Sequence, residues 1–87
     1  MGPEELYLAG YSNYNQLYYT KASTQLTDVA SGGGELGQNA AFHLGDCYLK
    51  LGDKQKALRV FVLASASDYS PEIKREAMLN AGKLQYE

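Results

Sequence analysis

This chain of 87 residues is poor in the residues from which disulfides and metal sites are built, with one cysteine, one histidine, two prolines and no tryptophan. Cys47 alone cannot form a disulfide within the chain, so cysteine usage indicates neither an oxidising nor a reducing compartment. A metal site built on His43 and Cys47 would need two further ligands, and the chain has no other histidine or cysteine to supply them. The sequence therefore predicts no metal and no cofactor.

Long hydrophobic runs are also missing. The longest, residues 60–66, is interrupted by Ser65 and is far shorter than the roughly 20 residues that cross a bilayer, so no direct membrane insertion is expected. Eight Lys and Arg stand against ten Asp and Glu, for a net charge of −2, which argues against nucleic acid as the main partner. The first five residues lack the basic and apolar segments of a signal peptide. The compartment stays open between the cytoplasm and a bacterial envelope or periplasm.

What the chain has is helical periodicity without strand alternation, which predicts an all-α fold of five helices with short connections and antiparallel neighbours. Pro3 and Pro71 suit first helical positions, and each is followed by a glutamate that complements the positive helix start. Gly52 suits a helix end and Asp53 the cap of the next helix. The apolar stripe of the third helix is expected to reach Leu51. The expected helices cover residues 3–14, 18–30, 35–51, 54–67 and 71–87.

Small residues recur at a nearly constant interval, because Gly10, Gly45 and Gly82 are separated by 35 and 37 positions. Apolar residues follow the first two glycines at +12, +16 and +19: Ala22, Leu26 and Val29, then Ala57, Phe61 and Ala64. This pattern is typical of helix pairs that approach closely. A glycine or alanine lets two backbones meet, and a large residue fills the space beside the crossing. The chain is therefore interpreted as an α-solenoid of repeated helix pairs.

In this pattern the chain resembles the tetratricopeptide repeat (TPR) family, whose unit is a helix–turn–helix of about 34 residues. The second unit carries the resemblance at Leu44, Gly45, Tyr48, Gly52, Ala57, Phe61 and Ala64. It departs at Ala41, where the family usually has a bulky residue, and at Pro71, which comes two positions late. In the first unit Asn13 and Leu17 replace the family's tyrosine and glycine. The slightly long period is similar to that of bacterial variants in envelope-associated proteins.

The resemblance implies about two and a half units: repeat 1 over about 3–34, repeat 2 over about 38–70, and a half repeat 3 over about 71–87. Because the last unit stops after its first helix, we expect the chain to be a segment of a longer protein. The final helix is expected to leave its apolar side partly exposed, which would allow a homo-oligomer to form through it. That side comprises Ile73, Ala77, Met78, Ala81 and Leu84.

His43, Asp46 and Cys47 lie within about one helical turn, which makes a catalytic Cys/His pair conceivable. An enzyme would also need a pocket and a neighbour that activates the thiol, and the sequence offers neither. The favoured interpretation is that Cys47 is a small buried residue and that His43 lies at the solvent edge.

Tyr7, Tyr11, Tyr14 and Tyr18 fall on one helix face, where they either pack on the second helix or line a surface. In the TPR family the first helix of each unit lines a concave face, so the resemblance implies a partner-binding groove. Carried onto this sequence, the groove comprises Tyr7, Tyr11, Tyr14, Asn39, Phe42, Asp46, Leu49, Lys50, Leu79 and Lys83. Aromatic side chains with a polar group suit peptide recognition because they bury a large area at low entropic cost.

These features predict a non-catalytic interaction module, or scaffold, that binds a peptide or helix of a partner protein in this groove. The alternative is a purely structural role, in which the segment is a spacer or a self-association element of a longer repeat superhelix.

Overall fold

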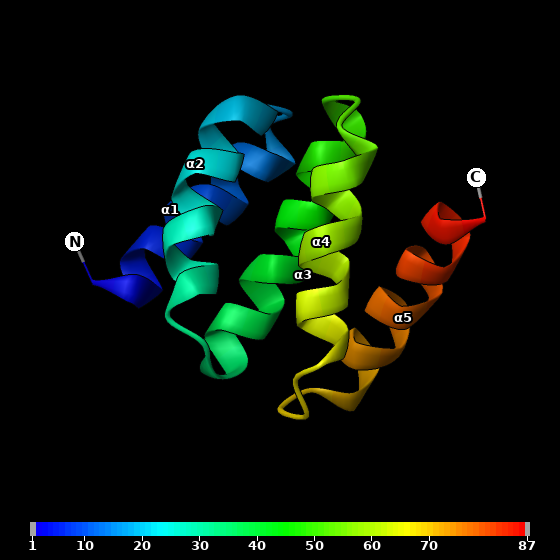
Figure 1. The fold of residues 1–87 in the computed structure, drawn as a ribbon. Helices are drawn as coiled ribbons and strands as arrows, with labels where there is room; N and C mark the ends of the chain where they lie inside the picture. The colour runs from blue at the N-terminus through cyan, green and yellow to red at the C-terminus, as the bar shows by residue number, and fades with distance from the viewer. Residues whose placement is uncertain (1, 87) are drawn as a thin grey trace.

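Five α-helices joined by connections of two to five residues make up residues 2–86, the part of the chain described by the structure, which is a computed structural model. The helices are α1 (Pro3–Asn15), α2 (Tyr19–Ser31), α3 (Gly34–Lys50), α4 (Lys54–Ser65) and α5 (Pro71–Gln85). These residues contain no strand. The predicted all-α class, the five helices and their antiparallel pairing are confirmed (Figure 1). Residue 87, expected in the fifth helix, lies outside the described residues.

Side chains cap the starts of α4 and α5, the first of them the expected Asp53. Asp53 accepts a hydrogen bond from the Lys56 amide at 3.0 Å, and Ser70 accepts one from the Ile73 amide at 3.4 Å. These side chains satisfy amides that have no partner inside the helix. Gly52, which ends α3, has a φ of +83°, a conformation that glycine adopts without the steric strain of an L side chain.

Consecutive helices pack along their length, and the odd-numbered helices also meet one another. Cα atoms of α1 approach those of α3 within 8 Å, and those of α3 approach α5, whereas no Cα of α2 lies within 8 Å of one in α4. In Figure 1 the helices accordingly follow one another across the molecule, with α2 and α4 in front of α1 and α3. The array therefore bends towards its odd-numbered helices, as an α-solenoid does.

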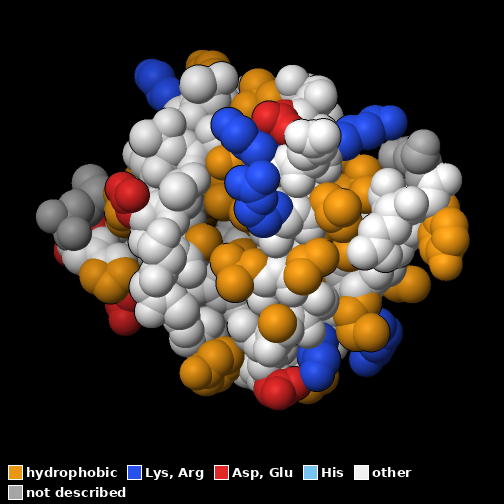
Figure 2. Space-filling model, viewed as in Figure 1, with side chains coloured by type: hydrophobic (Ala, Val, Ile, Leu, Met, Phe, Trp, Pro, Cys, Tyr) orange, Lys and Arg blue, Asp and Glu red, His pale blue; other side chains and the backbone are white. Residues whose placement is uncertain are grey.

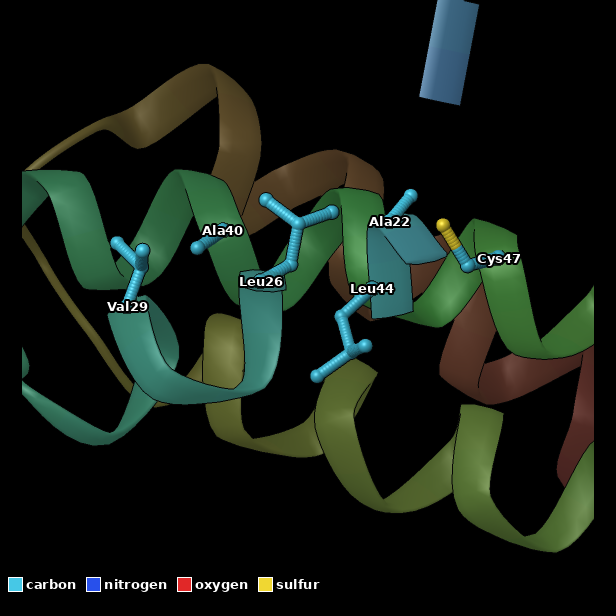
Figure 3. Packing of buried hydrophobic residues seen from close by; sticks show 6 residues of the cluster. All are labelled: Ala22, Leu26, Val29, Ala40, Leu44 and Cys47. Carbon is cyan, nitrogen blue, oxygen red and sulfur yellow. The ribbon is translucent and has the colours of Figure 1, made fainter. Parts of the chain in front are cut away.

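The core has two parts that share α3. On one side, α2 contributes Ala22, Leu26 and Val29, and α3 contributes Ala40, Leu44 and Cys47, all at most 3% exposed (Figure 3). On the other side, Ala41 of α3 meets the small and aromatic residues of α4 and α5: Ala57, Phe61, Ala64, Ala77 and Ala81. Because most of these residues are small, the helix backbones lie close together. The interior is therefore filled by closely spaced backbones more than by large side chains.

The repeated glycines mark the closest helix contacts. A Cβ atom placed on Gly10 would lie 2.9 Å from the Leu26 side chain, and one placed on Gly45 would lie 2.6 Å from the Phe61 ring. Both distances are below van der Waals contact, so a side chain at either position would force its neighbour to shift. Gly82 differs, because a Cβ there would have no atom within 4 Å apart from its chain neighbours and the backbone of its own helix. The predicted small-to-large pairing is thus present in the first two units, and its counterpart at Gly82 is open.

One buried side chain, Gln38 of α3, holds the connection between α4 and α5. Its Nε2 donates to the carbonyl oxygens of Ala64 (3.1 Å), Ser67 (2.7 Å) and Ser70 (3.3 Å), and its Oε1 accepts from the Ser70 amide at 2.7 Å. A buried polar group without a partner costs about 1–3 kcal/mol, so this amide fixes the end of α4 and the start of α5 together. Gln38 binds carbonyl oxygens at the end of α4, and the helix ends at Ser65 rather than at residue 67.

One expectation about an apolar face is corrected, at Leu51, and the partly exposed side of α5 can be assigned residue by residue. Leu51 does not join the apolar stripe of α3, because it follows the helix in the turn, and its side chain is 46% exposed. On α5, Ala77 and Ala81 are not exposed but buried against α4, since alanines allow the two helices to approach closely. Of the residues expected on the open side of α5, Met78 is the one that is well exposed, at 56%. No helix within residues 2–86 is long and apolar enough to cross a membrane.

The contrast between Gly45 and Gly82 gives a matched test of this packing. We predict that Gly45→Ala lowers the free energy of unfolding, because over-packing against the fully buried Phe61 costs about 1–3 kcal/mol and outweighs the roughly 1 kcal/mol that alanine gains over glycine in a helix. Gly82→Ala, which meets no neighbour, should raise the free energy of unfolding by up to about 1 kcal/mol. Urea unfolding followed by circular dichroism measures both changes, and equal effects of the two substitutions would refute the close contact at Gly45.

Candidate interaction face

The face formed by α1, α3 and α5, named here the odd-helix face, carries the residues predicted to bind a partner. These helices start new units of the repeat, run in the same direction and contact one another in turn. Residues at equivalent positions in successive units therefore lie side by side on this face, although 35 or 37 residues separate them in the sequence. The face is assembled by tertiary packing and not by any one helix.

The tyrosines of α1 form a stacked row. The Tyr7 and Tyr11 rings have centroids 6.0 Å apart with an interplanar angle of 7°, and the Tyr11 and Tyr14 rings are 6.0 Å apart at 20°. Spacings of four and three residues place these side chains on one helix face, which allows the stacking. Tyr11 is 37% exposed, whereas Tyr7 and Tyr14 are half-buried and also touch the core between α1, α2 and α3. Tyr18, expected on the same face, follows α1 in the turn and lies outside this row.

His43 of α3 is the centre of the aromatic cluster. Its ring centroid lies 4.9 Å from that of Tyr11, 5.4 Å from that of Tyr14 and 5.5 Å from that of Phe42. His43, expected at the solvent edge, is half-buried there between α1 and α3. Burial lowers the pKa of His43 below its ordinary value of 6.5, and the nearby carboxylate of Asp46 offsets part of that shift.

A hydrogen bond between Tyr14 and Asp46 ties the row of tyrosines to α3. The Tyr14 hydroxyl donates to Oδ2 of Asp46. Burial, together with this bond, raises the pKa of Tyr14 well above its ordinary value, so the phenol stays protonated and neutral. Asp46 is therefore engaged within the protein rather than fully available to a partner.

Cys47 is completely buried in the core, as the sequence predicted. Burial raises the pKa of its thiol to about 11, the reverse of the change that activates a nucleophilic cysteine. His43 is on the same helix but faces the tyrosines of α1. The described residues include no group of three or more His, Cys, Asp or Glu side chains placed to hold a metal ion.

The structure brings part of the predicted groove together and leaves part of it apart. Five of the predicted residues join the aromatic cluster or its hydrogen bond: Tyr7, Tyr11, Tyr14, Phe42 and Asp46. Asn39 lies beside them in an open depression of about 330 Å³ that Glu4, Glu35 and Leu36 also line. Leu49 is half-buried against the core around Phe61, so packing accounts for it. Lys50, Leu79 and Lys83 are exposed on α3 and α5, outside the aromatic cluster.

Two residues important for this face were not identified from the sequence, His43 as its centre and Gln38 as the anchor of α5. For His43 a signal was present, because Asn39, His43 and Asp46 have the same spacing as Tyr7, Tyr11 and Tyr14. Equal spacing on two parallel helices predicts rows that can meet. No such signal exists for Gln38, whose partners are backbone groups of a distant loop.

Comparison of the chain with protein-family models, with curated proteins and with solved structures gave no match. The fold and the geometry of the odd-helix face are therefore the basis for any proposal about function.

The position of His43 predicts a pH dependence of stability. Since the pKa of His43 is lower in the folded protein than in the unfolded chain, the unfolded chain binds more protons near pH 6. The free energy of unfolding should thus decrease as the pH falls from about 7.5 to about 5.5, and His43→Gln should flatten this slope. The proton resonances of the single imidazole ring report the same pKa directly. A midpoint at or above 6.5 would contradict the half-buried position of the ring.

Proposed function

We propose that the chain is a non-catalytic protein-interaction module of the tetratricopeptide type, and that it binds a peptide or helix of a partner protein on the odd-helix face. The observation that carries the proposal is the aromatic cluster across α1 and α3, in which Tyr11 remains exposed while His43 holds the row of tyrosines in place. Rings fixed in this way can cover a ligand without losing further side-chain freedom, which lowers the entropic cost of binding. Their hydroxyl groups add hydrogen-bonding capacity to a large apolar area.

The tetratricopeptide part of the proposal is supported by the contacts of the repeated glycines. Gly10 receives Leu26 and Gly45 receives Phe61 at equivalent places in two successive helix pairs. The bend of the array towards α1, α3 and α5 is the curvature with which such repeats form extended concave surfaces. Leu79 and Lys83, exposed on α5, would extend the surface beyond the aromatic cluster.

Selection of a random peptide library on the purified chain tests this function. Selected peptides should bind Tyr11→Ser about 10- to 100-fold more weakly than the original protein, because loss of a central aromatic contact typically costs 1–3 kcal/mol. Leu63→Ser is the matched control, since Leu63 is exposed on α4 outside the odd-helix face. Equal binding to the Tyr11 variant, with unchanged circular dichroism, would rule out the odd-helix face as the binding site.

A second candidate function, self-association or a place within a longer superhelix, is favoured by the open side of α5. Gly82 has no neighbour where Gly10 and Gly45 have one, and Met78 and Leu79 are each more than half exposed nearby. In Figure 2 hydrophobic side chains gather over α4 and beside α5, whereas the surface over α2 shows few of them. A helix laid against α5 would cover this surface.

Light scattering across a concentration series separates the two candidates. If α5 pairs with a second copy, the mean mass should rise with protein concentration, and Met78→Glu should return it to that of the monomer because a buried charge without a partner is unfavourable. Leu8→Glu, at an exposed leucine of α1, serves as the control. A constant monomer mass up to about 1 mM would exclude a pairing of measurable affinity.

A further inference from the structure

The end of the molecule where the α1–α2 and α3–α4 turns lie side by side carries an apolar depression outside the odd-helix face. Its volume is about 320 Å³, and it is lined by Leu17 and Tyr18 of the α1–α2 turn, by residues 19–21 at the start of α2, and by Leu51 of the α3–α4 turn. Three of the lining side chains are large and well exposed, Leu17 at 67%, Tyr18 at 54% and Leu51 at 46%. This surface is named here the hairpin-end surface, and both turns are visible at the top of Figure 1.

Leu17 adopts a backbone conformation that disfavours leucine. Its φ is +68°, and it is the one residue other than glycine with positive φ among residues 2–86. Gly52, seven positions after Gly45 as Leu17 is after Gly10, makes the equivalent turn with φ +83°. The backbone bonds also correspond, since the amide after each residue donates to a carbonyl five residues back, Tyr18 to Asn13 and Asp53 to Tyr48, both at 2.8 Å.

Stability alone therefore favours glycine at position 17. The leucine side chain gives nothing to the core in return, because two thirds of it is exposed to solvent. Strain of this kind is typical of positions kept for a functional reason. What leucine adds at this position, compared with glycine, is an apolar side chain at the rim of the depression.

The charge around the hairpin-end surface is positive, although the whole chain is acidic. Four of the eight basic residues lie at the helix ends beside the two turns: Lys21, Lys50, Lys54 and Lys56. The two turns themselves contain a single acidic residue, Asp53. In Figure 2 basic side chains surround this upper end of the molecule. α2 also begins here without a side-chain cap and without an acid in its first turn, so its positive end is not compensated by the protein.

Lys21 links the apolar and charged parts of this surface. Its Nζ lies 5.8 Å from the centre of the Tyr18 ring, which holds the ammonium group at the edge of the depression. Lys21 is also the one charged residue lining a neighbouring depression with Thr20, Thr24 and Gln25 along α2. A ligand that places an apolar side chain in the first depression would thus meet, further along α2, a site at Lys21 that favours an anion.

We propose that the hairpin-end surface binds an acidic amphipathic segment of a partner protein. One bulky apolar side chain of that segment fills the depression between Leu17, Tyr18 and Leu51, and a neighbouring carboxylate pairs with Lys21. The concave shape favours a single inserted side chain over a flat bilayer surface. This site is separate from the odd-helix face and does not depend on the function proposed for that face.

The test uses the ¹⁵N-labelled protein and two short acetylated peptides, each with one Leu-Phe pair, flanked by Asp and Glu in one peptide and by Lys in the other. The acidic peptide should shift the amide resonances of residues 17–21 and 50–52, and the basic peptide should bind at least about tenfold more weakly. Leu17→Gly should weaken the acidic peptide about tenfold and at the same time raise the melting temperature by about 4–8 °C, since it removes both the anchor and the strain. Lys21→Glu should abolish binding, while Arg75→Glu, at an exposed basic residue of α5 that belongs to neither surface, should not.

Each remaining outcome contradicts the proposal. It fails if the acidic peptide causes no shift in residues 17–21 up to about 1 mM, or if Leu17→Gly binds as well as the original protein. Shifts confined to Tyr7, Tyr11 and His43 would assign the peptide to the odd-helix face instead. Sedimentation with phosphatidylserine vesicles that depends on Leu17, without peptide binding, would make the hairpin-end surface a membrane contact.

Discussion

The contact between the Gly45 backbone and the Phe61 ring is the constraint on which the other helix positions depend. With no side chain at Gly45, α4 approaches α3 closely enough for Phe61 to be fully buried between small residues. That approach leaves α3 with two packed sides, one against α2 and one against α4 and α5. The equivalent contact of Gly10 with Leu26 sets the distance between α1 and α2 in the same way. Repetition of one close contact thus produces a regular array from an irregular sequence.

The hydrogen bonds of Gln38 add a second constraint, which acts on the connection between α4 and α5. Helix packing alone would leave the loop after α4 free to vary, but one buried amide binds the last carbonyls of α4 and the amide that precedes α5. Polar groups in a dry interior are costly unless they are fully paired, so a single geometry of the loop is strongly preferred. The direction of α5, and with it the extent of the odd-helix face, follows from that geometry.

The two candidate surfaces use different physical properties of the same repeat. On the odd-helix face, successive units bring aromatic rings from α1 and α3 together, and His43 fixes them in a half-buried cluster. At the hairpin end, the turns of the two units lie side by side, and a leucine stands where the second unit has glycine. The first surface comes from regularity of the repeat and the second from a departure from it. Function in repeat proteins commonly lies in positions that the packing leaves free to vary.

Local patterns in the sequence were sufficient to predict the five helices, the cap at Asp53 and the close contacts of Gly10 and Gly45, because hydrophobic period, capping residues and small-residue spacing act over a few turns of helix. The repeat period also predicted a set of residues for the odd-helix face. Part of that set meets in the aromatic cluster, whereas Lys50, Leu79 and Lys83 lie outside it. Local patterns did not predict the burial of His43 and Gln38, the exposure of Leu51 or the burial of Ala77 and Ala81. Those depend on which distant groups meet: a row of tyrosines for His43, a loop backbone for Gln38 and the close approach of α4 for the alanines. The sequence by itself determined the repeat, and only the tertiary structure decided which of its polar and apolar side chains the neighbouring units would cover.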